Sequence, residues 1–151
     1  MSVEELSEAF AGVMTGFTRL VRRRLRREMP GPLLRGAQIE LLRLVAANPG
    51  ISVSAAAKEL YLAGNSVSTV VNQLAAAGLL RRETRSDDRR SARLLATPEA
   101  EARLRAWKER RVALVREHME RLSDDDRAAL TAAMPALRRL ADDLQEEVTA
   151  V

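Results

Sequence analysis

The middle of the chain is predicted to form a short helix, a tight turn, a second helix and a β-hairpin in direct succession. Ser52 is an N-cap for the first helix, the turn covers residues 61–64, and the second helix stops at Gly78, a residue type that readily adopts a left-handed conformation. The two strands of the hairpin are expected over residues 79–84 and 91–97. This order predicts a helix-turn-helix with a wing.

Amphipathic helices are predicted on both sides of this unit. A helix over residues 2–28 repeats its apolar residues at steps of three and four, and it begins at a capping box of Ser2 and Glu5. The other flanking helices are expected over residues 35–47, 98–122 and 124–148. The predicted fold class is therefore mainly α with a small β-hairpin, a winged helix-turn-helix flanked by N- and C-terminal helices.

The composition suits a helical globular protein and excludes several chemistries. Apolar residues make up 46% of the chain and charged residues 30%, whereas aromatic residues make up only 3%. The chain has no cysteine, which excludes disulfides, thiolate nucleophiles and cysteine-ligated metals. No apolar run approaches the roughly 20 residues that span a bilayer, and the first residues lack the features of a signal peptide. We therefore expect a cytoplasmic protein with no membrane partner.

The second helix of the motif carries short polar side chains that suit base recognition. Val67, Val70, Val71 and Leu74 are expected to form its buried side. The polar residues that we predict to contact DNA in the major groove are Asn65, Ser66, Ser68, Thr69 and Asn72. A polar face that only contacts solvent is the alternative. The hairpin that follows the helix favours DNA binding.

The hairpin concentrates positive charge. Six arginines lie between residues 81 and 93, together with three acidic residues. We predict that a protruding loop with Arg85, Arg89 and Arg90 enters the minor groove, where the negative potential is strongest. Asp88 is expected to pair locally with an arginine and to support the wing. An ordinary charged turn is the alternative, and the acidic residues favour it.

Basic residues are concentrated in the first two thirds of the chain. Residues 1–100 hold 15 basic and 10 acidic side chains, whereas residues 101–151 hold 10 and 11. A run of arginines at residues 22–27 lies at the end of the first predicted helix. Its members either contact DNA phosphates or complement the negative end of the helix and keep its surface soluble.

Two stretches resemble the MarR-type transcriptional regulators. The segment from Leu74 to Arg82 is similar to the stretch that leads from recognition helix to wing in that family. The sequence Asp88-Arg89-Arg90, followed seven residues after Arg90 by Thr97, is similar to the wing signature of the family. The resemblance implies that Arg90 is the arginine in the minor groove and that Asp88 positions the wing.

Three positions depart from the pattern of the family. Ala96 stands before Thr97 where the family usually has Leu, Thr69 stands where the recognition helix often has Arg, and Asn72 stands where it usually has an acid. The missing arginine argues against strong guanine recognition by this helix. We therefore expect the wing and backbone contacts to carry more of the affinity.

The resemblance also implies a homodimer. Apolar stripes over residues 3–25, 104–122 and 130–148 offer more apolar surface than one small winged domain needs to cover. We expect one domain over residues 1–151, and a dimer would present two recognition helices to a palindromic operator in double-stranded DNA. The DNA-binding region and the two parts of the dimerisation region are expected over residues 33–98, 1–29 and 99–151.

Regulators of this family often bind a small aromatic or apolar effector. Residues that we expect to line such a site are Met14, Phe17, Arg43 and Trp107. Each of them is alternatively an ordinary core or surface residue. No cofactor or metal is expected, because the single histidine, His118, has no cysteine partners and the acids at residues 124–126 are explained as a helix start.

The leading hypothesis is a ligand-responsive repressor that binds a specific palindrome. The chain has no phosphate-binding glycine loop and no nucleophile elbow, so we do not expect an enzyme. The first rival is a nonspecific architectural DNA-binding protein with the same arginine-rich surface. The second is a protein–protein adaptor whose winged domain has lost DNA binding, which Thr69 and the acidic C-terminal region would suit.

Overall fold

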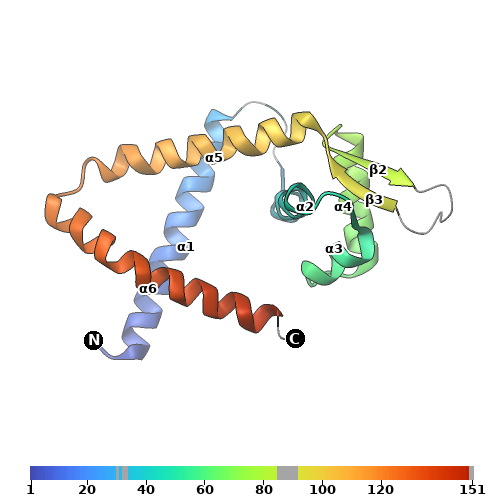
Figure 1. Cartoon of the computed structure of the whole chain (residues 1–151). Helices are drawn as coiled ribbons and strands as arrows, with labels where there is room; N and C mark the ends of the chain where they lie inside the picture. Colours follow the sequence, from blue (N-terminus) through green and yellow to red (C-terminus); the bar gives the residue numbers. More distant parts are fainter. Residues whose placement is uncertain (30, 32–33, 85–91, 150–151) are drawn as a thin grey trace. The chain divides into compact units, whose positions relative to one another are not determined.

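The computed structural model describes residues 1–29, 31, 34–84 and 92–149 (Figure 1). Its contacts divide the chain into two compact units, Met1–Arg111 and Val112–Val151, which are described separately here. This division falls inside a helix. The expected functional division, with DNA binding over residues 33–98, stays a prediction.

The elements follow the predicted order. The first unit contains α1 (Val3–Glu28), α2 (Gly36–Ala47), β1 (Ile51–Ser52), α3 (Val53–Glu59), α4 (Gly64–Ala76), β2 (Leu80–Thr84) and β3 (Ala92–Ala96). Helix α5 (Pro98–Met119) runs from the first unit into the second, where α6 (Asp124–Thr149) follows it. The predicted fold class is confirmed: a mainly helical chain with a winged helix-turn-helix.

Most helix starts are formed by the residues that the sequence predicts. The Ser2 hydroxyl accepts from the Glu5 amide at 3.2 Å, and Glu5 Oε2 accepts from the Ser2 amide at 2.6 Å, which completes the capping box of α1. Ser52 accepts from the Ala55 amide at 3.1 Å and so begins α3. These caps pair backbone donors that have no partner within the helix.

Helix α4 ends in a Schellman motif at Gly78. The Leu79 amide donates to the Leu74 carbonyl at 2.9 Å, and the Gly78 amide donates to the Ala75 carbonyl at 3.0 Å. The motif requires a left-handed residue, and Gly78 has φ of +73°. The chain therefore turns sharply from α4 into the first strand of the hairpin.

The sheet has three antiparallel strands in the order β1-β3-β2. Leu80 pairs with Ala96, and the register continues to Thr84 opposite Ala92. Strand β1 places Ile51 opposite Leu94, and the Gly50 amide donates to the Leu94 carbonyl at 2.8 Å. Only the hairpin was predicted from the sequence, and β1 was not, because a strand of two residues is too short to show an alternating pattern.

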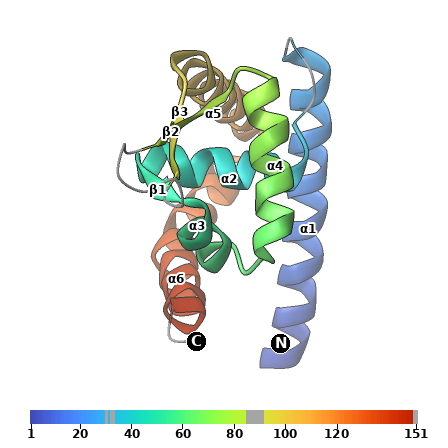
Figure 2. The same cartoon turned by 90° about the vertical axis from the view of Figure 1, so that its right-hand side faces the viewer.

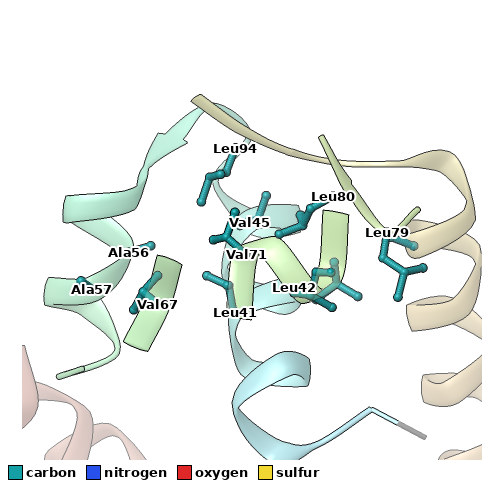
Figure 3. Packing of buried hydrophobic residues seen from close by; sticks show 12 residues of the cluster. Leu41, Leu42, Val45, Ala56, Ala57, Val67, Val71, Leu79, Leu80 and Leu94 are labelled. Atoms are coloured by element: carbon teal, nitrogen blue, oxygen red, sulfur yellow. The ribbon is translucent and has the colours of Figure 1, made fainter. Parts of the chain in front are cut away.

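The core lies where α2, α3, α4 and the sheet meet, and in Figure 2 these three helices pack beside the strands. It is built from aliphatic side chains, several of which are labelled in Figure 3. Leu42, Val45, Val71, Leu74 and Leu94 are completely buried. The scarcity of aromatic residues therefore leaves a core of leucine, valine and alanine.

Apolar side chains outside this core are exposed in both units. On α1 only Leu25 is buried, and Val13, Phe17 and Leu20 are 68%, 48% and 57% exposed. In the second unit, Leu130, Met134, Leu140 and Leu144 of α6 are also exposed. Isolated exposed leucines are ordinary, but regularly spaced apolar residues along whole helices are typical of surfaces that pack against a partner.

Candidate nucleic-acid interface

Helix α4 presents one apolar and one polar face. Val67, Val71 and Leu74 are buried at steps of four and three residues, and they hold the helix against α2 and α3. The polar residues on the exposed side are Asn65, Ser66, Thr69, Asn72 and Gln73, and Ser68 is half-buried at the edge. The structure therefore brings together on one exposed helix the polar residues predicted for this segment.

Two residues near the start of α4 bond to its own backbone. Asn65 Oδ1 accepts from the Ser66 amide at 2.8 Å. The Thr69 hydroxyl donates to the Asn65 carbonyl at 3.0 Å. Each side chain is thereby held close to the helix, in an orientation set by its backbone partner.

Two residues near the end of α4 bond to other elements. Arg82 Nη2 in β2 donates to Asn72 Oδ1 at 2.7 Å, which connects the helix to the base of the wing. Gln38 Nε2 at the start of α2 donates to Gln73 Oε1 at 3.0 Å. Gln38 Oε1 in turn accepts from the Arg35 amide at 2.8 Å. Arg82 and Gln38 were not predicted as members of the site. An asparagine close in sequence to an arginine-rich strand was a signal for the pair of Asn72 and Arg82.

The base of the wing is described, and its loop is not. On β2, Arg81 pairs with Glu83 at 3.4 Å. On β3, the Arg93 side chain packs over Gly50, where a Cβ added to the glycine would lie 3.7 Å from Arg93 Cδ. Arg85, Asp88, Arg89 and Arg90, which we predict to act in the loop, lie outside the described residues. Their roles stay predictions.

Thr97 connects the end of the wing to two other elements. Its hydroxyl donates to the Gly78 carbonyl at 2.7 Å and accepts from the Ala100 amide at 3.2 Å, while its own amide donates to the Leu79 carbonyl at 3.1 Å. The predicted N-cap of α5 is confirmed. Thr97 also fixes the position of β3 relative to the end of α4.

Of the four residues expected to line an effector site, Met14 and Trp107 line two different pockets of the first unit. Trp107 lines a small cavity of about 30 Å³ in the first unit. The other residues that line this cavity are Arg26, Met29, Gly31, Leu34, Ile39, Arg103 and Leu104. Met14, Phe17 and Arg43 do not line it, and the first two are exposed on α1. The assignment of all four residues to an effector site stays a prediction.

Arginines from three helices influence one another in the first unit. Partial burial lowers the pKa of Arg43 in α2, and the positive charges of Arg111 and Arg22 lower it further. The predicted cluster at the end of α1 is partly paired, since Arg24 lies 3.3 Å from Glu28. Glu28 also binds Arg110, and that hydrogen bond lowers the pKa of the Glu28 carboxyl.

Metal sites and membrane-spanning helices are both absent from the described parts of the chain. Those parts contain no cluster of three or more His, Cys, Asp or Glu side chains that could hold a metal ion. None of the helices found there combines the length and the apolar character required to cross a membrane. At the start of α6, the Ser123 hydroxyl accepts from the Asp126 amide at 3.1 Å and Asp124 binds Arg127, as expected for a helix start.

Comparison with known proteins agrees with this geometry. The model of the MarR family matches residues 34–91. A protein of Thauera aromatica described as a transcriptional regulatory protein for the hcr operon is 34% identical over 99 residues. That alignment covers 66% of this chain and 60% of the relative, so it spans less than two thirds of the relative's length.

Solved structures match almost the whole chain. A protein of Pseudomonas aeruginosa described as a transcriptional regulator is 26% identical, with a TM-score of 0.70 over 93% of this chain and 98% of the other. FabT of Streptococcus pneumoniae, solved in complex with DNA, has 20% identity and a TM-score of 0.70 over 95% of this chain and 99% of the other.

The fold and the polar face of α4 define a winged helix-turn-helix protein. The family model and the structural matches indicate which class of winged helix-turn-helix protein this is. Residues 34–91, which include α2, α3, α4 and the first strand of the hairpin, match the MarR family of transcriptional regulators, as the resemblance to that family predicted.

Proposed function

We propose that the chain is a dimeric, sequence-specific DNA-binding regulator, a repressor that a small ligand releases from its operator, and not an enzyme. Helix α4 is the observation that carries the proposal. Its apolar side is buried in the core, and its exposed side carries short polar side chains beside the base of an arginine-rich hairpin. The similarity to FabT, which was solved with DNA, supports a DNA duplex as the partner.

Dimerisation is supported by the apolar residues that remain exposed. On α1, Leu6, Val13 and Leu20 are more than half exposed, and α6 exposes Leu140 and Leu144. Full burial of an exposed aliphatic side chain stabilises a protein by about 1.5–3 kcal/mol, so covering the exposed half of each of these contributes about 1 kcal/mol. Several such contributions together favour the association of two copies. A symmetric dimer would place two recognition helices in successive major grooves of a palindrome, roughly 34–36 Å apart.

Binding specificity tests the proposal. Fluorescence anisotropy would compare the promoter upstream of the chain's own gene with a shuffled duplex at about 0.15 M salt. A specific regulator should favour the promoter by about a thousandfold or more. Equal affinity for both duplexes would support the architectural protein instead. Unchanged binding after R89A and R90A would contradict the predicted role of the wing.

The oligomeric state is tested independently of DNA. Sedimentation at micromolar concentration should give twice the mass of one chain. L20E places a charge in the exposed apolar stripe of α1 and should shift the protein toward monomer, whereas the matched variant E8Q on the same helix should not. A wild-type monomer that also binds no duplex at low ionic strength would refute the proposal.

Release by a ligand is supported by the cavity beside Trp107. At about 30 Å³ it has room for roughly one water molecule, so an aromatic ligand requires its lining side chains to move. Leu34 and Ile39 belong to that lining and flank Gln38, which binds Gln73 of the recognition helix. A ligand that displaces the start of α2 would therefore also displace α4.

Benzoate is a suitable first probe of the effector class. If it binds at this cavity, it should raise the melting temperature and weaken promoter binding, and W107A should abolish both effects. W107A must still bind the promoter without benzoate, which shows that it folds. Release of DNA that persists in W107A would place the effector elsewhere.

A further inference from the structure

The amide side chains on the exposed face of α4 share one property: their carbonyl oxygens accept hydrogen bonds within the protein. The three bonds join Asn65 Oδ1 to the Ser66 amide at 2.8 Å, Asn72 Oδ1 to Arg82 Nη2 at 2.7 Å, and Gln73 Oε1 to Gln38 Nε2 at 3.0 Å. Each amide therefore directs its oxygen to a donor within the protein, and among the described residues its NH₂ group makes no hydrogen bond.

The orientation of each amide follows from the chemistry of its partner. A guanidinium and a backbone N–H can only donate, so Arg82 and the Ser66 amide each require an oxygen opposite them. Gln38 donates to Gln73 through its side-chain nitrogen, because its side-chain oxygen already accepts from the Arg35 amide at 2.8 Å. Turning any of these amides by 180° would place two donors against each other, so the orientations are fixed.

Fixed orientation changes which base an asparagine can recognise. An asparagine that recognises adenine uses both ends of its amide, the oxygen for the N6 donor and the nitrogen for the N7 acceptor. Guanine presents two acceptors, N7 and O6, and no donor at that position of the major groove. With its oxygen held by Arg82, Asn72 offers N–H donors, which match guanine.

We propose that Arg82 is a specificity-determining positioning residue that makes Asn72 a donor to guanine and prevents adenine recognition. The inference rests on the proposed function, in which α4 enters the major groove of an operator. Arg82 acts through Asn72 and need not touch a base. The chain thereby obtains a guanine contact from an amide, although Thr69 stands where the family often has an arginine.

Selection of bound duplexes from a random pool, with the full-length protein, tests this role. The base pair whose preference disappears in N72A is the one that faces Asn72. At that pair the wild type should favour guanine over adenine by about tenfold, the lower part of the range for a good base contact. In R82A the amide is free to turn, so the ratio should fall below about threefold or favour adenine.

R81A is the matched control, because Arg81 is the neighbouring arginine on β2 and pairs with Glu83 rather than with α4. It removes the same positive charge, so it should weaken binding to all duplexes without changing the preferred base.

N72D is a second variant. It keeps a partner for Arg82 but offers no donor, so the guanine preference should be lost while the melting temperature stays near that of the wild type.

The outcomes separate this inference from the function on which it rests. A wild type that enriches no sequence refutes the proposed function, and the inference with it. A wild type that enriches a sequence but prefers adenine opposite Asn72 refutes the inference alone. So does an R82A variant that keeps the guanine preference of the wild type and R81A.

Discussion

Thr97 is the residue at which the hairpin, the end of α4 and the start of α5 are joined, and its substitution gives a measurable prediction. Its hydroxyl donates to the Gly78 carbonyl at 2.7 Å and accepts from the Ala100 amide at 3.2 Å. Thr97→Ala removes both hydrogen bonds and leaves the Thr97 amide bond to Leu79 in place. The backbone connection is therefore retained, and only the contribution of the hydroxyl is tested.

The magnitude follows from the two bonds. Loss of an N-cap hydroxyl costs about 1 kcal/mol of stability. The bond to Gly78 adds about 0.5 kcal/mol, the low end for a net hydrogen bond, because Gly78 is exposed and water can replace the donor. We expect Thr97→Ala to lower the free energy of unfolding by about 1.5 kcal/mol, roughly a tenfold change in the unfolding equilibrium.

Urea unfolding followed by far-UV circular dichroism measures this loss, with all variants at the same chain concentration because a dimer is stabilised by mass action. Thr97→Ser keeps a hydroxyl that can make both bonds, so it should retain most of the stability. A Thr97→Ala variant within about 0.3 kcal/mol of the wild type would refute the reasoning. Equal losses in Ala and Ser variants would show that the methyl group, not the hydroxyl, matters.

Further predictions concern the backbone, the core and charge. Gly78→Ala should cost about 1 kcal/mol because φ is +73°, and Gly78→Asn should cost less; equal losses would contradict the backbone argument. Leu94→Ala removes a completely buried side chain and should cost about 3 kcal/mol in the same unfolding assay. The hydrogen bond from Arg110 lowers the pKa of Glu28 from its ordinary 4.5. The stability that this hydrogen bond contributes is therefore fully present above pH 4.5 and is lost as the pH falls through the lowered pKa of Glu28. Glu28→Gln should therefore be less stable than the wild type at neutral pH and equal to it in strong acid, as thermal melts at both pH values would show. Tyr61→Gly should stabilise by about 0.5 kcal/mol, because Tyr61 has φ of +52° and is 59% exposed; a loss of stability would show that its side chain contributes more than its backbone costs.

The parts of the fold that the sequence predicted are those governed by neighbours along the chain. The Ser2–Glu5 capping box and the Ser52 cap join residues three positions apart, and the stop at Gly78 depends on that residue's own conformation. The apolar spacing of Val67, Val71 and Leu74 likewise depends only on the helical period. Such signals are complete within a short stretch of sequence, so they need no knowledge of tertiary structure.

The parts that the sequence did not predict depend on residues distant along the chain. Strand β1 exists because residues 51 and 52 meet β3, some forty residues later, and a two-residue stretch has no period of its own. The bond between Gln38 and Gln73 spans 35 positions. In the candidate site, the predicted polar residues of α4 are exposed except for Ser68, which is half-buried, and their contact with DNA stays a prediction. The partners that orient them were not predicted.

Orientation is the property that separates a polar helix from a recognition helix. Short polar residues on an exposed face suit both solvent and DNA, so exposure alone does not distinguish the two. Three amides whose oxygens are held by donors within the protein present a defined set of N–H groups before any partner arrives. Holding them beforehand lowers the entropy lost on binding, which is a cost that flexible side chains incur when they dock. Two of these bonds also connect α4 to α2 and β2, so they stabilise the fold and at the same time leave the exposed face of α4 ordered for a defined partner.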